Sequence, residues 1–100
     1  MTFDELEQTV VKWHLDRNLI EGSTDATQMV KLFEEVNELH QDVSYGRDLR
    51  DELGDCLVVL INIAARNNFS LYEALEYSFS KIKDRKGEMR DGIWVKEEDL

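Results

Sequence analysis

The stretch KLFEEVNELHQDVSYGRDLRDELGDCLVVLIN, residues Lys31–Asn62, contains two acidic clusters, each within a segment whose apolar residues recur at helical spacing. Residues three or four positions apart share a face of a helix, so Glu35 projects beside Glu38, and Glu52 beside Asp55. We therefore expect two neighbouring helices to bring four carboxylates toward a common point.

Carboxylates held this close together need a positive partner. Like charges that are shielded from water repel each other strongly, so protons or a bound cation must neutralise them. A hard divalent cation with oxygen ligands suits such a cluster, and Mg²⁺ is the usual ion where phosphate groups supply further ligands. The sequence predicts an Mg²⁺ site, with Mn²⁺ as an alternative ion, held by Glu35, Glu38, Glu52 and Asp55.

Acidic residues outnumber basic ones by 22 to 12, which gives the 100-residue chain a formal charge of −10. Proteins that bind duplex nucleic acid or an anionic membrane surface need a basic footprint, so the composition argues against both classes. We expect residues 1–100 to form a single domain. A chain this small gains stability by associating with other copies.

Three features indicate a cytoplasmic protein. The single cysteine, Cys56, lies in an apolar run and is expected to be a reduced, buried thiol. The N-terminus lacks the basic and apolar regions of a secretion signal. The longest apolar run, Cys56–Ile61, is far too short to span a membrane.

The repeating pattern of apolar residues, in a chain without proline, predicts an all-α fold of four helices. The helices are expected at residues 2–18, 25–44, 48–66 and 70–87, with Thr2, Asp25, Asp48 and Ser70 as N-terminal caps. Gly87 would end the fourth helix. Apart from a short extended piece at residues 92–95, about the last ten residues are expected to be a loose tail.

Each helix is expected to bury one apolar stripe. The first helix would bury Phe3, Leu6, Val10 and Trp13, and the fourth Leu71, Leu75, Phe79 and Ile82. The third helix is apolar on most sides, apart from a stripe that contains Glu52, Asp55 and Asn62, so it must be central or meet another subunit. His14 and His40 are expected at the surface.

The predicted cation site provides the elements of phosphoanhydride hydrolysis. A cation bound there keeps positions open for water and for phosphate oxygens of a substrate, and it acts as a Lewis acid on the phosphoryl group. Glu34, next to the ligand pair, could orient or deprotonate the water, and Glu38 is a second catalytic candidate. The candidates for substrate binding are Lys31, Asn62, Lys81, Lys83, Arg85, Lys86 and the stacking residue Trp13.

The pattern Glu34-Glu35-x-x-Glu38, followed after 13 residues by Glu52-x-x-Asp55, resembles the signature of the MazG-like all-α nucleoside triphosphate pyrophosphohydrolases. The resemblance is to the compact single-domain members of bacteria and phages. It extends over most of the chain, from Gln28-x-x-Lys31-Leu32 before the first motif to Lys83-x-Arg85-Lys86-Gly87 at the end of the fourth helix.

The resemblance implies an Mg²⁺-dependent enzyme that cleaves an NTP or dNTP to the monophosphate and pyrophosphate, in a housekeeping role for the nucleotide pool. It also implies a four-helix bundle completed by oligomerisation, as a homodimer or a dimer of dimers whose subunits build the site together. By matching positions, Glu34 would activate water, and the metal ligands would be Glu35, Glu38, Glu52 and Asp55. The family includes specialists for phosphoribosyl-ATP, dUTP and dCTP, so the resemblance leaves the base open.

Simpler interpretations exist for these residues. Either acidic motif alone could be a solvated helix face, the basic residues suit the negative end of a helix dipole, and Trp13 and Asn62 could be core residues. An acidic helical adaptor without catalysis is the alternative function, because it also explains the charge. A carboxylate-bridged di-iron site requires Glu-x-x-His pairs, and neither His14 nor His40 follows a glutamate by three positions.

Overall fold

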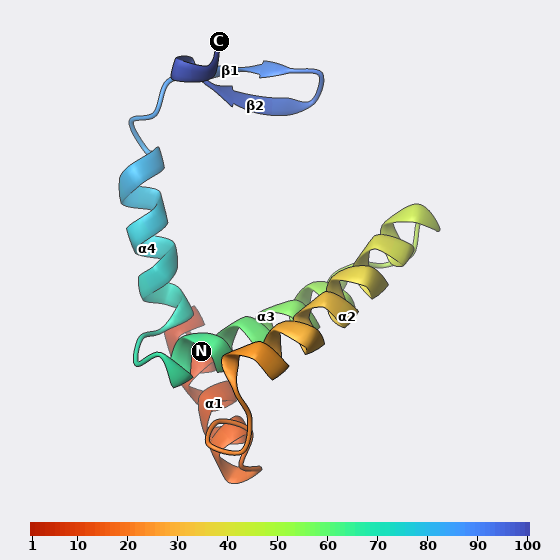
Figure 1. Cartoon of the computed structure of the whole chain (residues 1–100), viewed down its shortest axis with the longest axis vertical. Helices are drawn as coiled ribbons and strands as arrows, with labels where there is room; N and C mark the ends of the chain where they lie inside the picture. Colours follow the sequence, from red (N-terminus) through yellow and green to blue (C-terminus); the bar gives the residue numbers. More distant parts are fainter.

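The computed structural model describes all residues 1–100 and contains four α-helices and a small β-hairpin (Figure 1). The elements, in chain order, are α1 (Phe3–Asp16), α2 (Asp25–Ser44), α3 (Arg50–Arg66), α4 (Leu71–Ile82), β1 (Gly87–Arg90), β2 (Ile93–Lys96) and the 3₁₀ helix η1 (Glu97–Asp99). The predicted all-α fold of four helices is confirmed, and the hairpin is added at the C-terminal end. None of the helices has both the length and the apolar character that a membrane crossing requires.

Two helices begin at the predicted caps. The Thr2 hydroxyl oxygen accepts a hydrogen bond from the backbone N–H of Glu5 at 3.1 Å, and the Ser70 hydroxyl accepts one from the N–H of Glu73 at 3.0 Å. Each bond satisfies an N–H group that has no partner within the helix. The starts of α1 and α4 are therefore determined by local sequence.

The other two helix starts differ slightly from the prediction. Thr24, rather than Asp25, caps α2, and its hydroxyl accepts a hydrogen bond from the N–H of Thr27 at 3.1 Å. Helix α3 begins at Arg50, and Asp48 accepts a hydrogen bond from the N–H of this residue at 2.9 Å. Because hydroxyl and carboxylate caps are similarly favourable, neighbouring residues compete for the position.

Helices α2 and α3 run antiparallel, side by side, and make the most extensive helix contact in the molecule (Figure 1). Helix α1 packs against α3. Helix α4 leaves this junction as an arm that carries the hairpin at its far end and is directed away from the α2–α3 pair. The chain consequently has an open V shape, with α4 as one limb and the α2–α3 pair as the other.

The buried apolar residues, Val59, Ile61 and Ala64, all belong to α3. The central position predicted for the third helix is confirmed, since α3 packs against each of the other three helices. The stripes predicted to be buried in the first and fourth helices are largely exposed instead: Phe3 exposes 46% of its surface and Leu75 exposes 63%. An arm that meets the other helices mainly at one end cannot cover its own apolar face.

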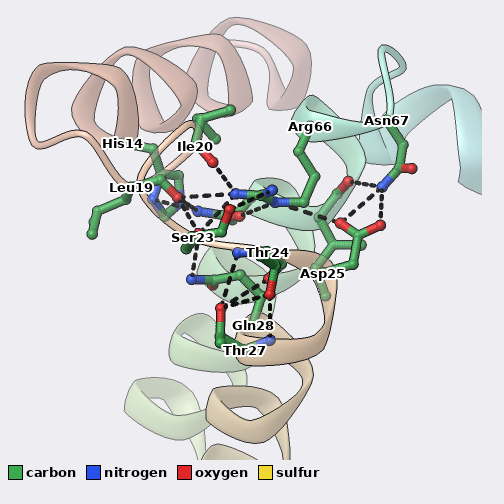
Figure 2. A network of polar contacts seen from close by, with 12 residues as sticks. His14, Leu19, Ile20, Ser23, Thr24, Asp25, Thr27, Gln28, Arg66 and Asn67 are labelled. Carbon is green, nitrogen blue, oxygen red and sulfur yellow. Dashed lines mark hydrogen bonds and ion pairs between the residues drawn. The ribbon is translucent and has the colours of Figure 1, made fainter.

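A polar network connects α1, α3 and the loop between α1 and α2 (Figure 2). His14, predicted at the surface, is buried, and its Nε2 lies 3.0 Å from the carbonyl oxygen of Val58. The Arg66 guanidinium donates hydrogen bonds to the backbone carbonyls of Ile20 and Ser23 in the loop. Because buried polar groups require partners, these contacts restrict how α1 can lie on α3.

The C-terminal part differs most from the prediction. Helix α4 ends at Ile82, well before Gly87, and Gly87 begins β1 instead. The residues expected to be a loose tail form β2 and η1, and the extended piece expected at residues 92–95 falls largely within β2. The strands join through Asp91 and Gly92, whose φ angles of 51° and 80° define a type I′ turn.

Candidate metal centre

The contact between α2 and α3 brings three acidic side chains together. One carboxylate oxygen from each of Glu35, Glu52 and Asp55 lies within 4.8 Å of the others. Glu35 comes from the middle of α2, whereas Glu52 and Asp55 stand about one turn apart near the start of α3. Oxygens at these separations can contact one divalent cation after small side-chain rotations.

Two oxygens of this centre have no partner within the protein. The Oε2 atoms of Glu35 and Glu52 are buried and make no hydrogen bond. A buried carboxylate oxygen without a donor is unfavourable, because it has lost its water. A cation among the three side chains would satisfy both atoms, so the donor set fits a hard divalent ion such as Mg²⁺.

The pKa values of the centre reflect its crowding. Burial, followed by the neighbouring carboxylates of Glu35 and Glu38, raises the pKa of Glu52 to about 7. Burial, followed by the negative charges of Asp51 and Glu35, raises the pKa of Asp55 above its usual value. Each shift opposes full ionisation of the centre, and a bound cation would reverse this by favouring the charged forms.

Lys31 supplies a positive charge at the edge of the centre. Its Nζ lies 3.1 Å from Oε1 of Glu35 and 3.5 Å from Oε2 of Glu34. The hydrogen bond from Lys31 lowers the pKa of Glu35, whereas the pKa values of the other two carboxyl groups are raised. The Glu34 side chain is 60% exposed and is not among the three converging carboxylates.

Glu38, predicted as the fourth ligand, does not join the converging carboxylates. It lies about one turn beyond Glu35 on α2 and is exposed. Its charge and a hydrogen bond between its side chain and that of Glu52 nevertheless contribute to the raised pKa of Glu52, so Glu38 lies directly beside the centre. The structure therefore brings together three of the four predicted ligands and leaves Glu38 on their solvent side.

A surface pocket of about 400 Å³ adjoins the centre between α1 and α3. It is lined by Thr9, Val10, Trp13, Asp55 and Val58, so the acid Asp55 belongs both to the pocket and to the centre. Thr9 and Val58 were not among the predicted site residues. Helical spacing offered a signal for both, because Thr9 precedes Trp13 by four residues and Val58 follows Asp55 by three.

Trp13 was predicted either to stack on a nucleobase or to belong to the core, and it is 45% exposed. The guanidinium carbon of Arg17 lies 4.4 Å from the centroid of its ring, and the ring of His14 meets it edge-on at 5.3 Å. Residues of its own helix segment thus hold the indole in place, while much of its surface stays open to the pocket.

Asn62 is a structural residue, and the predicted contact with substrate does not fit its position. Its side chain is completely buried. Nδ2 donates to the carbonyl oxygen of Leu19 at 2.8 Å and lies 3.3 Å from Nδ1 of His14, while Oδ1 accepts from Arg66 at 3.2 Å. Its polar atoms are all engaged within the protein, so none is available to a ligand.

The predicted basic patch lies on the arm rather than at the acidic centre. Lys81 is in the last turn of α4, while Lys83, Arg85 and Lys86 follow the end of the helix. Because α4 runs away from the α2–α3 pair, these cations do not approach the centre within one chain (Figure 1). Lys81 instead places Nζ 5.0 Å from the centroid of the Tyr77 ring.

Comparison with known protein families gives a match over most of the chain. The family model of the MazG nucleotide pyrophosphohydrolase domain matches residues 23–89. This region contains α2, α3 and α4, and so every carboxylate of the centre. Helix α1 with Trp13 precedes the matched region, and most of the hairpin follows it.

Among curated proteins, the chain is 38% identical over 66 residues to an uncharacterized 18.2 kDa protein in the rep-hol intergenic region of Haemophilus phage HP1 (strain HP1c1). The aligned region is 64% of this chain and 40% of the relative. The chain therefore spans about two fifths of the length of that protein. No solved structure matches the chain.

Proposed function

Since this chain belongs to the MazG nucleotide pyrophosphohydrolase family, we propose that it hydrolyses an NTP or dNTP to the monophosphate and pyrophosphate, and so helps to maintain the nucleotide pool. The observation that carries the proposal is the convergence of Glu35, Glu52 and Asp55, with two buried oxygens that lack a partner. A solvated acidic helix face would keep such oxygens in water. This arrangement favours an enzyme over an acidic adaptor.

The three carboxylates would hold Mg²⁺, or Mn²⁺ in its place. Such an ion would keep coordination positions open for water and for phosphate oxygens of a substrate. When bound, the cation polarises the phosphoryl group and offsets the charge that develops as the phosphoanhydride bond breaks. Glu52 and Asp55 would hold it in their ionised forms and would therefore release any bound protons.

The remaining steps involve side chains around the centre. Water attacks the α-phosphorus, the bond from this phosphorus to the α–β bridging oxygen breaks, and pyrophosphate leaves. Glu38, on the solvent side of the centre, accepts the proton of the attacking water. Glu34 holds Lys31 at the edge of the centre, where the ammonium group can pair with a phosphate oxygen.

The pocket beside the centre provides a place for the nucleoside. Its wall contains the half-exposed indole of Trp13, on which a base can stack, and the hydroxyl of Thr9, which can donate or accept a hydrogen bond. Asp55 joins the pocket to the metal centre. A nucleotide whose base lies against Trp13 would therefore direct its phosphates toward the carboxylates.

The large exposed surface area of the single chain supports the proposal that the functional unit contains a second copy. Its accessible area is 7579 Å², whereas a compact monomer of 11.7 kDa exposes about 5,900 Å². The excess of roughly 1,700 Å² is comparable to the area that one subunit buries in an obligate dimer. We therefore propose a homodimer or dimer of dimers, in which basic residues of one arm would lie near the centre of another copy.

The activity is tested by incubating the protein with mixed NTPs and dNTPs and Mg²⁺, and by identifying the products. Monophosphate with pyrophosphate is the expected result. Release of orthophosphate would point to a different phosphatase activity. The absence of turnover with every nucleotide would favour the adaptor, and screening the nucleotides one by one identifies the preferred base.

The centre itself is tested with Asp55→Asn and with the matched control Asp51→Asn, which changes an exposed acid one turn away on the same helix. Asp55→Asn should lower Mg²⁺ affinity by at least about tenfold in isothermal titration and abolish turnover. Asp51→Asn removes a charge that acts on Asp55 but is not among the converging carboxylates, so it should lower Mg²⁺ affinity much less than Asp55→Asn and should leave turnover measurable. Unchanged Mg²⁺ binding in Asp55→Asn would remove this residue from the ligand set.

A further inference from the structure

The C-terminal hairpin has no neighbouring strand and little helical support. Strands β1 and β2 form a two-stranded sheet at the end of the arm, clear of α1, α2 and α3 (Figure 1). Trp94 meets Ile82 and Arg85 at a shallow pocket of about 260 Å³ where the hairpin joins α4. A two-stranded hairpin is only marginally stable in water, so this one is expected to acquire further strands or a packing partner.

The pairing pattern determines which backbone groups of β1 are free. A two-residue turn is flanked by a hydrogen-bonded pair, which here is Arg90 and Ile93. The next pair, Met89 and Trp94, is then of the non-hydrogen-bonded type. The N–H and C=O groups of Met89 consequently point to the open edge, where another strand can bind them.

The charges on this edge are complementary to themselves. Glu88 and Arg90 flank Met89 on one face of β1 and form an ion pair within the strand. If a second β1 lies antiparallel with Met89 opposite Met89, then Glu88 of each copy faces Arg90 of the other. Opposite charges directly across antiparallel strands stabilise their pairing.

Strand β1 carries only some of the features that keep edge strands single. It is short and charged, but it has no lysine, proline or β-bulge. Strand β1 has the sequence Gly-Glu-Met-Arg and pairs with β2 without a bulge. Its Met89 is 61% exposed, and Trp94, on the same face of β2, is 49% exposed.

We propose that β1 pairs with β1 of a second copy of this chain, about a two-fold axis at Met89, to give a four-stranded antiparallel sheet. Trp94 and Met89 of one copy would then continue into Met89 and Trp94 of the other as one apolar row across the sheet. This interface joins the arms of two copies. It lies apart from the acidic centre and does not depend on the proposed activity.

Disulfide formation tests the register. Hydrogen-bonded antiparallel pairs have Cα atoms about 5.5 Å apart, within the range of a disulfide. In a Cys56→Ala background, Met89→Cys should form a disulfide-linked dimer in mild oxidant, roughly tenfold faster than the matched control Ile93→Cys. Ile93 is similarly exposed, at 68%, but lies on β2 away from the axis. Equal rates for the two variants, or no dimer with Met89→Cys, would overturn the proposal.

Charge reversal separates contacts between copies from contacts within one strand. In the Met89→Cys background, Glu88→Arg and Arg90→Glu each remove the ion pair within the strand and place like charges across the axis. Each variant alone should cross-link several-fold more slowly than its parent. Mixing the two should restore the rate, because opposite charges face each other only between unlike copies. A mixture that cross-links no faster than its components would refute pairing through β1.

Discussion

At the scale of single residues, Glu52 shows how the centre is arranged for a cation. Burial and the acids Glu35 and Glu38 raise its pKa to about 7, while its Oε2 atom lacks a partner. Near neutral pH and without metal, a proton therefore occupies this carboxyl group for much of the time. A divalent cation must displace that proton, so Mg²⁺ affinity should rise as the pH increases through about 7.

The raised pKa of Glu52 predicts an unusual pH dependence of stability. Between about pH 4.5 and 7 the native protein without metal retains a proton that the unfolded chain releases, so this residue lowers the free energy of unfolding as the pH rises. Urea unfolding in the presence of a chelator, repeated across this range, should show the decline. Glu52→Gln should reduce it, whereas the exposed control Glu34→Gln should preserve it.

The contribution of His14 to stability depends on pH in the opposite direction. Burial lowers its pKa. Its Nε2–H can donate to the carbonyl oxygen of Val58, and its Nδ1 can accept from the amide of Asn62, which matches the neutral ring. A second proton, on Nδ1, would face the Asn62 amide donor and break that hydrogen bond.

We therefore predict that the contribution of His14 to stability is lost as the pH falls below about 6.5, the ordinary pKa of the side chain. The unfolded chain takes up a proton there before the native protein does. Thermal unfolding from pH 7.5 to 5 should show a smaller acid loss in His14→Gln than in the parent. His40→Gln, at an exposed position, serves as the control, and identical slopes in all three proteins would contradict the prediction.

At the scale of elements, one side chain of α1 connects the arm, α4, to the other helices. Glu7 of α1 is 1% exposed, and its two carboxylate oxygens accept hydrogen bonds from the backbone N–H groups of Leu71 and Tyr72. These N–H groups belong to the first turn of α4, where they have no helical partner and favour a negative charge. Since no residue of α4 is buried, Glu7 is a principal anchor of the arm.

Glu7→Gln should lower the free energy of unfolding by roughly 2 kcal/mol, because its amide group would oppose a backbone donor in a buried position. Hydrogen exchange should accelerate at the amides of Leu71 and Tyr72 while the middle of α3 stays protected. The control Glu76→Gln alters an exposed acid on α4 itself. If Glu7→Gln exchanges as slowly as the parent at these amides, the anchor lies elsewhere.

At the scale of the whole molecule, the chain is extended for its length. Its radius of gyration is 16.2 Å, whereas a compact chain of 100 residues has about 13 Å. Large apolar side chains remain open on both limbs of the V, including Phe33 and Val36 of α2 and Leu75 and Phe79 of α4. A second copy that covers these faces would provide the core that one chain lacks.

We predict that the thermal midpoint depends on protein concentration. For a folded dimer, tenfold dilution lowers the free energy of unfolding by about 1.4 kcal/mol, so the thermal midpoint should fall by several degrees. Leu75→Asp should reduce association in light scattering, whereas Ser80→Asp places the same charge on the same helix outside the apolar stripe. A concentration-independent midpoint, together with the mass of a monomer, would contradict this account.

The sequence predicted well those features that depend on near neighbours in the chain. The caps Thr2 and Ser70 and the all-α class follow from local spacing and were confirmed. The end of α4 was placed too late, because Gly87 can either terminate a helix or begin a strand. Only the pairing with Lys96 across a type I′ turn decides between these states.

In the candidate site, too, some features follow from local sequence and others from tertiary packing. Spacing along a helix determined that Glu35 and Glu38 share one face of α2, and Glu52 and Asp55 one face of α3. Only the tertiary structure decided that Glu35 meets the α3 pair while Glu38 stays outside. The period of a helix determines which residues share a face, but the rotation and height of one helix against its neighbour arise from packing between distant segments. The same packing placed His14, Asn62 and Trp13, and no local pattern of the sequence contains that information.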